Sequence, residues 1–248
     1  QIEIFKSFNA DSIIHVFPDK KIAQLALKVG IPIRVGTSHR FYHLVYCNKL
    51  INLGRKKSNL HESQLNIKLI SALGINTDVK LEYISALKLA KTIKKAYDKV
   101  LSFIDKGKVN IIFHPHSKGS AREWSIENYI SLCNMLPEDK YNIIFGGTEV
   151  EAQKYRQFFD KLNRSIVDTG GKLSLEQYIL LISNCEALLA ASTGHLHIAA
   201  IMGKHDLGIY PQIRPMHPGR WAPIGEKTHV FVKDKICSDC KTQILASA

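Results

Sequence analysis

The sequence has no apolar run that approaches the ~20 residues a membrane-spanning helix requires. Its 248 residues include only five cysteines, which are scattered, so we expect free thiols in a reducing compartment rather than a disulfide framework. The first residues lack a basic start followed by an apolar block, so no signal peptide is expected. Internal repeats and low-complexity tracts are absent as well. These absences exclude membrane-spanning and disulfide-rich secreted proteins and leave a globular protein, expected in the cytoplasm.

Acidic residues are also few, with 22 Asp and Glu against 34 Lys and Arg, which gives a net charge of +12. This excess favours anionic partners such as nucleic acids, acidic lipid headgroups or phosphorylated small molecules. No basic stripe interleaved with aromatic residues is present, so we expect no nucleic-acid partner. Cys237 and Cys240 have the spacing of half a zinc site, but no second pair follows. No metal is therefore expected.

The second part of the chain shows regular alternation between strand and helix patterns. Strands are predicted at 109–113, 141–145, 165–168, 187–191 and 206–210, and helices at 125–136, 149–162, 175–184 and from 197 onward. Strict alternation predicts a doubly wound parallel sheet, with ligands at the carboxyl ends of its strands.

The first part is less regular. The pattern predicts strands at 12–17 and 32–35, a helix between them that ends at Gly30, an amphipathic helix at 61–73 and a long helix from Leu81 to Asp105. Residues 38–60 are mixed polar and aromatic, and we expect a surface loop there.

The segment from Ala187 to Gly203 carries the strongest functional signal. A buried strand ends in Ser192-Thr193-Gly194, and a helix pattern follows almost at once. Such a turn leaves backbone N–H groups at the positive end of the helix dipole, where phosphate binds well. An ordinary turn with Thr193 as helix cap fits these residues equally well, so both interpretations remain open here.

Four loops rich in Gly, Ser and Thr follow the predicted strands at the same edge of the sheet. They are residues 114–122, 146–149, 169–173 and 192–194. Arg122 would offset phosphate charge, and Glu149 would accept hydrogen bonds from ribose hydroxyls. Together the loops predict a nucleotide site.

The histidines near this edge look structural. His195 and His197 are two residues apart and do not share a helix face, so they make a poor metal pair. His114 and His116 alternate across the end of a strand, so at most one of them is expected to face the site.

The order of these motifs resembles glycosyltransferase family nine, the heptosyltransferase-like enzymes of lipopolysaccharide assembly. The similar segments are His114-Pro115, Arg122-Glu123-Trp124, Phe145-Gly146-Gly147, Lys172-Leu173-Ser174-Leu175-Glu176, Thr193-Gly194, His197-Ile198-Ala199-Ala200, Pro211 and the late Cys237-x-x-Cys240. The resemblance is good from Val109 to Cys240 and looser over residues 10–75.

The resemblance implies an α/β fold of the GT-B type, with two Rossmann-like domains and parallel sheets. Residues 1–95 would be the acceptor-side domain, truncated at its amino terminus, and residues 96–248 the nucleotide-sugar-binding domain. The implied reaction is inverting transfer of a heptose from ADP-heptose to a lipopolysaccharide-type, saccharide or lipid-linked acceptor. It would need no cofactor and no metal, and the basic surface would allow peripheral contact with an anionic inner membrane.

The resemblance also assigns roles to individual residues. Arg122, where the family usually has Lys, would stabilise the leaving diphosphate. The donor would contact Ser117, Leu173, Ser192, Thr193, Gly194 and His197, with Glu149, or its rival Glu151, at the ribose. Two departures stand out: Ser192 replaces the family's usual Asp, and the catalytic base is not among these residues. They keep open a non-catalytic nucleotide-sugar-binding relative, and a nucleotide-sugar epimerase is a third alternative.

Overall fold

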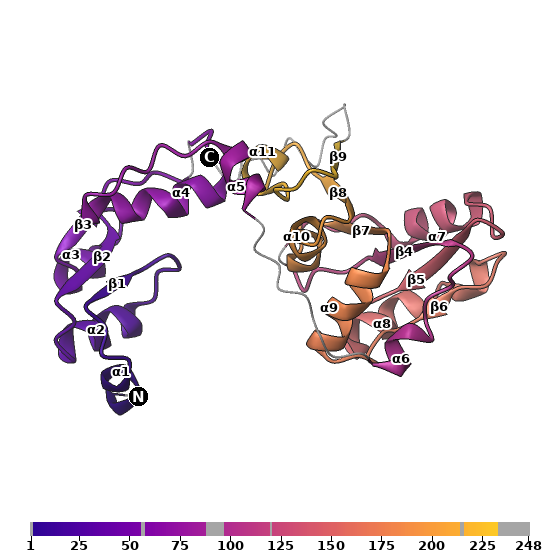
Figure 1. The fold of residues 1–248 in the computed structure, drawn as a ribbon, viewed down its shortest axis with the longest axis horizontal. Helices are drawn as coiled ribbons and strands as arrows, with labels where there is room; N and C mark the ends of the chain where they lie inside the picture. Colours follow the sequence, from indigo (N-terminus) through magenta and orange to yellow (C-terminus); the bar gives the residue numbers. More distant parts are fainter. Residues whose placement is uncertain (1, 56–57, 88–96, 120, 214–215, 233–248) are drawn as a thin grey trace. The chain divides into compact units, whose positions relative to one another are not determined.

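The computed structural model describes residues 2–55, 58–87, 97–119, 121–213 and 216–232. The chain divides into two compact units, Gln1–Ile84 and Ser85–Ala248, which we call unit 1 and unit 2 (Figure 1). The boundary predicted between residues 95 and 96 lies outside the described residues.

Unit 2 is built on a parallel sheet that has six strands within the described residues. The strands are β4 (Val109–His114), β5 (Tyr141–Phe145), β6 (Val167–Asp168), β7 (Ala187–Ala191), β8 (His205–Tyr210) and β9 (Thr228–Val232). Their order is β6-β5-β4-β7-β8-β9, and the register pairs Ile112 with both Ile144 and Leu188. The strand order reverses between β4 and β7, which is the point where doubly wound sheets bind ligands.

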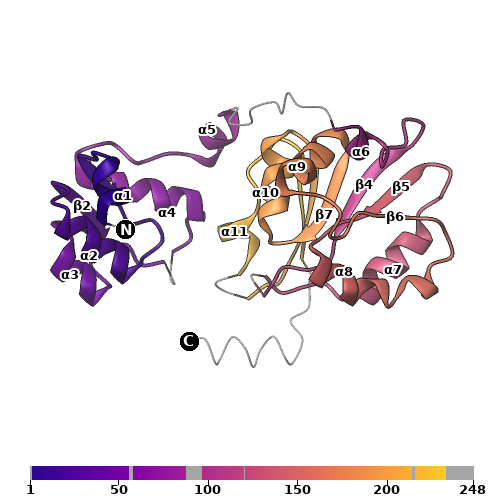
Figure 2. The ribbon, with the colours of Figure 1, turned by 90° about the horizontal axis from the view of Figure 1, so that it is seen from below.

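Helices cover both faces of this sheet (Figure 2). They are α6 (Asp98–Leu101), α7 (Ile126–Met135), α8 (Glu149–Arg156), α9 (Leu175–Asn184), α10 (Gly194–Ile201) and α11 (Pro218–Trp221), with a 3-10 turn at Phe159–Lys161. One core cluster joins α9 and α10 to one face of the sheet through Leu181, Leu188 and Leu196. A second cluster joins α7 and α8 to the other face through Tyr129, Phe145 and Tyr155. Alternate side chains of the strands therefore pack into two separate cores, one on each face of the sheet.

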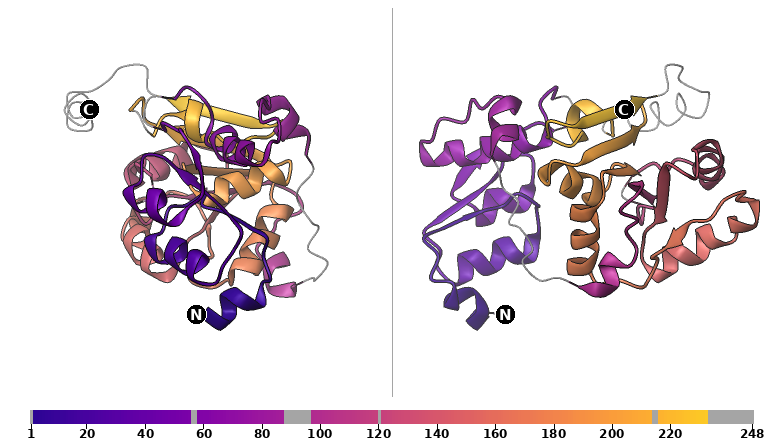
Figure 3. Two further views of the ribbon diagram at one scale, coloured as in Figure 1. Left: turned by 90° about the vertical axis from the view of Figure 1, so that its left-hand side faces the viewer. Right: turned by 45° about the vertical axis from the view of Figure 1, so that its right-hand side comes forward.

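Unit 1 contains a smaller parallel sheet, with β1 (Ser12–Ile14), β2 (Ile33–Thr37) and β3 (Lys49–Ile51) in that order. Its helices, in indigo and purple in Figure 3, are α1 (Ile2–Ser7), α2 (Lys20–Lys28), α3 (Phe41–Tyr46), α4 (Glu62–Lys68) and α5 (Leu81–Ala86), with a 3-10 turn at Leu69–Leu73. Asp19 caps α2 by accepting a hydrogen bond from the amide of Ile22 at 2.9 Å. Both units are therefore α/β, as the alternation of patterns predicts.

Three expectations about single elements are wrong. Residues 38–60 do not form one surface loop, because α3 and β3 lie there. Strand β3 has only three residues; it is a strand because it pairs with β2, and its own sequence shows no strand pattern. The described part of the long helix predicted from Leu81 to Asp105 consists of the separate helices α5 and α6. Finally, β8 is followed by another strand, β9, at the edge of the sheet, in yellow in Figure 3.

Within the described residues, no helix is both long enough and apolar enough to span a bilayer. Cys133 and Cys185 are buried free thiols, as their positions in apolar helical patterns predict, and Cys47 is buried as well. Cys237 and Cys240 lie outside the described residues.

Candidate functional site

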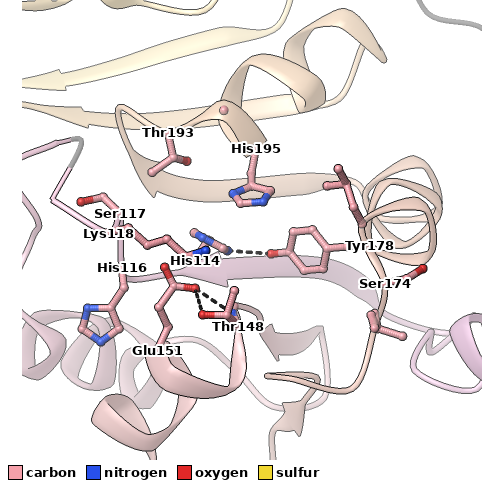
Figure 4. Close-up of a pocket in the computed structure, with 14 residues that line it drawn as sticks. His114, His116, Ser117, Lys118, Thr148, Glu151, Ser174, Tyr178, Thr193 and His195 are labelled. Carbon is pink, nitrogen blue, oxygen red and sulfur yellow. Dashed lines mark hydrogen bonds between the residues drawn. The ribbon is translucent and has the colours of Figure 1, made fainter. Parts of the chain in front are cut away.

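A cavity of about 390 Å³ opens in unit 2 at the point where the strand order reverses (Figure 4). We call it the β4–β7 cavity, and its described lining is His114, His116, Ser117, Lys118, Gly147, Thr148, Glu151, Leu173, Ser174, Leu175, Tyr178, Thr193, Gly194 and His195. All four loops that the sequence places at the carboxyl ends of the strands contribute to this lining, and the helices α8, α9 and α10 that follow three of them supply the rest. The predicted convergence of the loops is therefore confirmed.

Three helices begin at the cavity, because the N-cap residues of α8, α9 and α10 are all in its lining. The first turn of α8 is closed by Glu151, whose Oε2 accepts hydrogen bonds from the amide and the hydroxyl of Thr148, each at 2.7 Å. The first turn of α9 is closed in the same way by the pair Ser174 and Gln177. The start of α10 differs, because the Thr193 side chain makes no capping hydrogen bond.

The uncapped start of α10 excludes the ordinary capped turn as an explanation of Ser192-Thr193-Gly194. Thr193 is only 6% exposed, and its Oγ1 has no hydrogen-bond partner among the described residues. Apart from the adjoining residues and the backbone of its own helix, no described heavy atom lies within 4 Å of the position a Cβ would take at Gly194. First-turn amides, a buried hydroxyl without a partner and open space next to the backbone together form a site for an anion.

His114 forms the floor of the cavity. Its Nδ1 lies 2.9 Å from the hydroxyl oxygen of Tyr178 on α9 (Figure 4). Burial raises the pKa of Tyr178. Burial also lowers the pKa of His114 to about 3, and the second-largest cause of that shift is the charge interaction with His195. The direction of this hydrogen bond depends on which nitrogen of the neutral imidazole carries the proton.

The charged residues of the cavity are Lys118 and Glu151. Lys118 is held at φ 52° in the left-handed region, and Gly119 follows at φ 80°. The loop that carries Lys118 is fastened by Glu123, whose carboxylate accepts from the amide of Ser117 at 2.6 Å and lies 2.9 Å from Nδ1 of His116. This loop thus places one exposed, positively charged side chain in the lining of the cavity that also contains the start of α10.

The sequence-predicted donor residues divide into two groups. Ser117, Leu173, Thr193 and Gly194 lie in the cavity lining. The remaining four, Arg122, Glu149, Ser192 and His197, are not part of its described lining.

For Glu149 and Ser192 of this second group, the interacting residues are identified. Glu149 pairs with Arg156 at 2.7 Å, and its rival Glu151 is the carboxylate that reaches the cavity. The Ser192 side chain hydrogen-bonds Tyr210.

The expectation that at most one of His114 and His116 faces the site is wrong, because both line the cavity. Strand β4 ends at His114, so the alternation of a strand does not extend to His116. His195, which the sequence suggested was structural, also lies in the lining. Lys118, Thr148 and Tyr178 were not identified beforehand; for Thr148 the signal was available, since Thr148 and Glu151 have the spacing of a capping box.

Within the described part of the chain, no group of three or more His, Cys, Asp or Glu side chains is placed to hold a metal ion. The polar groups of the described lining are instead helix amides, hydroxyls, imidazoles, one ammonium and the Glu151 carboxylate, which accepts hydrogen bonds at the start of α8. This set suits an anionic organic ligand better than a cation.

The sequence profile of glycosyltransferase family 9 (heptosyltransferase) matches residues 5–245. The chain belongs to glycosyltransferase family 9. Among curated members, it is 26% identical over 200 residues to lipooligosaccharide heptosyltransferase 2 of Haemophilus influenzae, covering 74% of this chain and 56% of that protein. It is 27% identical over 132 residues to the lipopolysaccharide core heptosyltransferase OpsX of the same organism, covering 52% and 37% respectively.

Solved structures of this family share the fold. The family 9 glycosyl transferase of Veillonella parvula superposes with a TM-score of 0.74 at 18% identity, over 99% of this chain and 69% of that one. The ADP-heptose lipopolysaccharide heptosyltransferase II of Escherichia coli gives 0.64 at 18% identity, over 92% and 73%. The fold is thus the GT-B-like α/β architecture of the heptosyltransferases. The chain spans between about a third and two thirds of the length of the curated relatives it matches.

Proposed function

We propose that this family 9 protein transfers a heptose from ADP-heptose to a lipopolysaccharide-type or other saccharide acceptor, in the cytoplasm. The observation that carries the proposal is the β4–β7 cavity, whose lining contains the uncapped start of α10, the Thr193 hydroxyl and Lys118. Such a set of donors suits the diphosphate of a nucleotide sugar. Two neighbouring structures in the same fold, of E. coli heptosyltransferase WaaC, contain ADP and an ADP-2-deoxy-2-fluoro heptose.

The chemistry follows from where charge develops. As the bond between sugar and diphosphate breaks, the leaving group gains negative charge. Fixed amides at the start of α10 would stabilise that charge without reorganising, together with Lys118 of the lining and with Arg122 farther along the same loop. We propose that the acceptor attacks from the opposite face and inverts the anomeric carbon, and that no metal takes part.

Three contacts complete the proposed donor site. Glu151 is better placed than Glu149 to hold the ribose hydroxyls, because it is the carboxylate in the lining. Leu173 would pack on the base, and Ser117 would lie next to the donor. Ser192 and His197, which are not in the described lining, would support the turn that Thr193 and Gly194 form at the donor.

The test is turnover of ADP-heptose by the full chain and its variants. Arg122→Ala should lower the rate by about 10²–10³, the usual cost of removing one donor that stabilises a developing anion. Gly194→Val should abolish donor binding, because the side chain would fill the open space next to the backbone. Lys140→Ala, an exposed cation at the amino end of β5, is the matched control and should leave turnover unchanged. Unchanged turnover in both site variants would refute the assignment, and unchanged turnover after EDTA treatment would support a metal-free reaction.

Ser192 supports a second candidate function, nucleotide-sugar binding without turnover. Family members commonly carry Asp at this position, whereas here a serine is occupied with Tyr210. Calorimetry with ADP and ADP-glucose, next to a product assay with ADP-heptose, separates the two functions. Binding without product would establish the binding protein.

We also propose peripheral contact with an anionic membrane. The chain carries a net charge of +12, and one of its relatives is named as a lipopolysaccharide core heptosyltransferase. Binding to vesicles that contain anionic lipid should weaken as salt rises, because salt screens exposed charges. Binding that is insensitive to salt would contradict this contact.

A further inference from the structure

The His195 side chain is the part of the β4–β7 cavity that the proposed function leaves without a role. His195 is the second residue of α10, and its ring reaches down to the floor of the cavity (Figure 4). The ring centroid lies 4.1 Å from that of His114 and 5.1 Å from that of Tyr178, onto which the His195 ring packs edge-on. These contacts fix the position of the imidazole next to the diphosphate site.

One nitrogen of this imidazole is unsatisfied. Nδ1 of His195 is buried and has no hydrogen-bond partner among the described residues, and the same is true of Oγ1 of Thr193 two residues earlier. Buried polar atoms without partners are costly, so native structures leave few of them. Two such atoms on either side of Gly194, at the uncapped start of one helix, indicate that a ligand supplies their partners.

The groups that face His195 come from four elements. Lys118 lies on the loop after β4, Glu151 on α8, Tyr178 on α9, and His114 and His116 at and after the end of β4. Burial is the largest cause of the lowered pKa of His195. The negative charge of Glu151 raises this pKa, and the positive charge of Lys118 lowers it further. The imidazole is therefore neutral in the empty cavity at pH 7, and a diphosphate beside it would favour its protonated form.

We propose that His195 binds the donor's diphosphate as an imidazolium, taking one proton from solvent when the nucleotide enters the cavity. The inference rests on the proposed function, since it requires a diphosphate at the start of α10. The proton is returned to solvent when the nucleotide leaves, so no other reactant is needed. His195 would then hold the anion more tightly in acidic than in alkaline solution, while the α10 amides and Thr193 act at every pH.

The test uses ADP-glucose, whose diphosphate is esterified at both ends and has no group that titrates between pH 6 and pH 8. Calorimetry on the full chain should show affinity about tenfold higher at pH 6 than at pH 8, the gain expected when a hydrogen bond becomes charge-assisted. Titrations in HEPES and in Tris, which have different ionisation enthalpies, should reveal net proton uptake. His195→Gln keeps a hydrogen-bonding group without the titration, so it should bind with equal affinity at both pH values and take up no proton.

Two further variants separate the alternatives. His229→Gln replaces an exposed imidazole of strand β9 that hydrogen-bonds His205 of β8. This variant should show the same pH dependence of binding as the wild type. His116→Gln should retain the pH dependence; if the dependence disappears there instead, the proton belongs to His116 and the proposal is overturned. Equal affinity at pH 6 and pH 8 in the wild-type chain would overturn the role of His195 alone. Absence of any binding of ADP-glucose or ADP would overturn the proposed function with it.

Discussion

Units 1 and 2 both place imidazoles at the carboxyl edge of a parallel sheet, but they use them differently. In unit 2, the ring centroids of His114 and His195 lie 4.1 Å apart on the floor of an open cavity, with the ring planes tilted by 42°. In unit 1, His15 follows β1 and lies 5.3 Å from His43 of α3, and both rings are almost fully buried. Two similar pairs of rings therefore have different surroundings: the pair in unit 1 is packed in a protein interior, and the pair in unit 2 borders the cavity at which we propose ligand binding.

The two units also differ in how much core supports these rings. Unit 2 has separate clusters on the two faces of its sheet. The cluster identified in unit 1 is built on Leu53, Leu65 and Leu69. Because the clusters share no residue, we expect the units to unfold separately, with unit 1 the less stable.

The largest expected effect comes from truncating one core residue in each unit. Leu188→Ala in β7 and Leu65→Ala in α4 should each cost about 2–5 kcal/mol of unfolding free energy, the usual result of opening a cavity in a packed core. Both tryptophans, Trp124 and Trp221, lie in unit 2, so fluorescence during urea unfolding reports on that unit alone.

Leu188→Ala should shift the fluorescence transition. Leu65→Ala should leave it in place and instead reduce the hydrogen-exchange protection of unit 1 amides. If both variants shift the fluorescence transition equally, the units unfold together and the comparison fails.

A smaller effect is expected from a methyl group added at one glycine in each unit. At Gly146, at the end of β5, a Cβ would collide with the hydroxyl of Tyr178; at Gly36 in β2 it would lie 2.8 Å from Sγ of Cys47 and from the ring of His43. Each glycine leaves room for a buried ring, so Gly146→Ala and Gly36→Ala should each cost about 1–3 kcal/mol in thermal or urea unfolding.

Only Gly146→Ala should also weaken nucleotide binding, because Tyr178 holds His114 in the cavity. Gly107→Ala is the matched control, since the nearest atom to its Cβ would lie at an ordinary contact distance of 3.4 Å. Equal loss of nucleotide affinity in Gly36→Ala and Gly146→Ala would remove the distinction between the two ring pairs.

The smallest effect is the response to acid. His114 has a pKa of about 3 in the folded chain and about 6.5 in the unfolded chain, so below pH 6.5 the unfolded state binds a proton that the folded state does not. Through His114 alone, the unfolding free energy should fall by about 1 kcal/mol between pH 6.5 and pH 5.5, and it should change little above pH 7.5. Burial lowers the pKa values of His15 and His43 too, so unit 1 should lose stability in the same direction.

Asp206 in β8 changes the unfolding free energy in the opposite direction as pH falls, because burial raises its pKa to about 6, above its value in the unfolded chain. The folded state gains stability from Asp206 as pH falls from above 6 towards 4, which offsets part of the loss in unit 2. Asp206→Asn should therefore make the acid response of the tryptophan transition steeper. A flatter response in that variant would contradict the assigned shift.

The sequence predicted most of unit 2 because local pattern and tertiary structure agree there. The predicted strands at 141–145 and 187–191 match β5 and β7 to the residue, and the predicted helix at 175–184 matches α9. It failed where the structure depends on distant partners: β3 is three residues long and exists through pairing with β2, and β9 completes an edge. Such short elements have no periodicity of their own to detect.

The site was predictable to the level of loops but not of side chains. Parallel topology alone brings the four loops together, so Ser117, Leu173, Thr193 and Gly194 were found. The choice between Glu149 and Glu151 depends on which carboxylate turns back to cap α8, and that is decided by side-chain geometry. The participation of His116 depends on the residue at which β4 ends.

The unpartnered hydroxyl of Thr193 has a consequence for attempts to make this protein more heat-resistant. A valine there has nearly the same shape and leaves no polar atom without a partner, so Thr193→Val should raise the melting temperature of the empty protein. A screen that rewards thermostability alone would then accumulate this change and lose nucleotide affinity unnoticed, so selection at this helix start should be carried out with the ligand present.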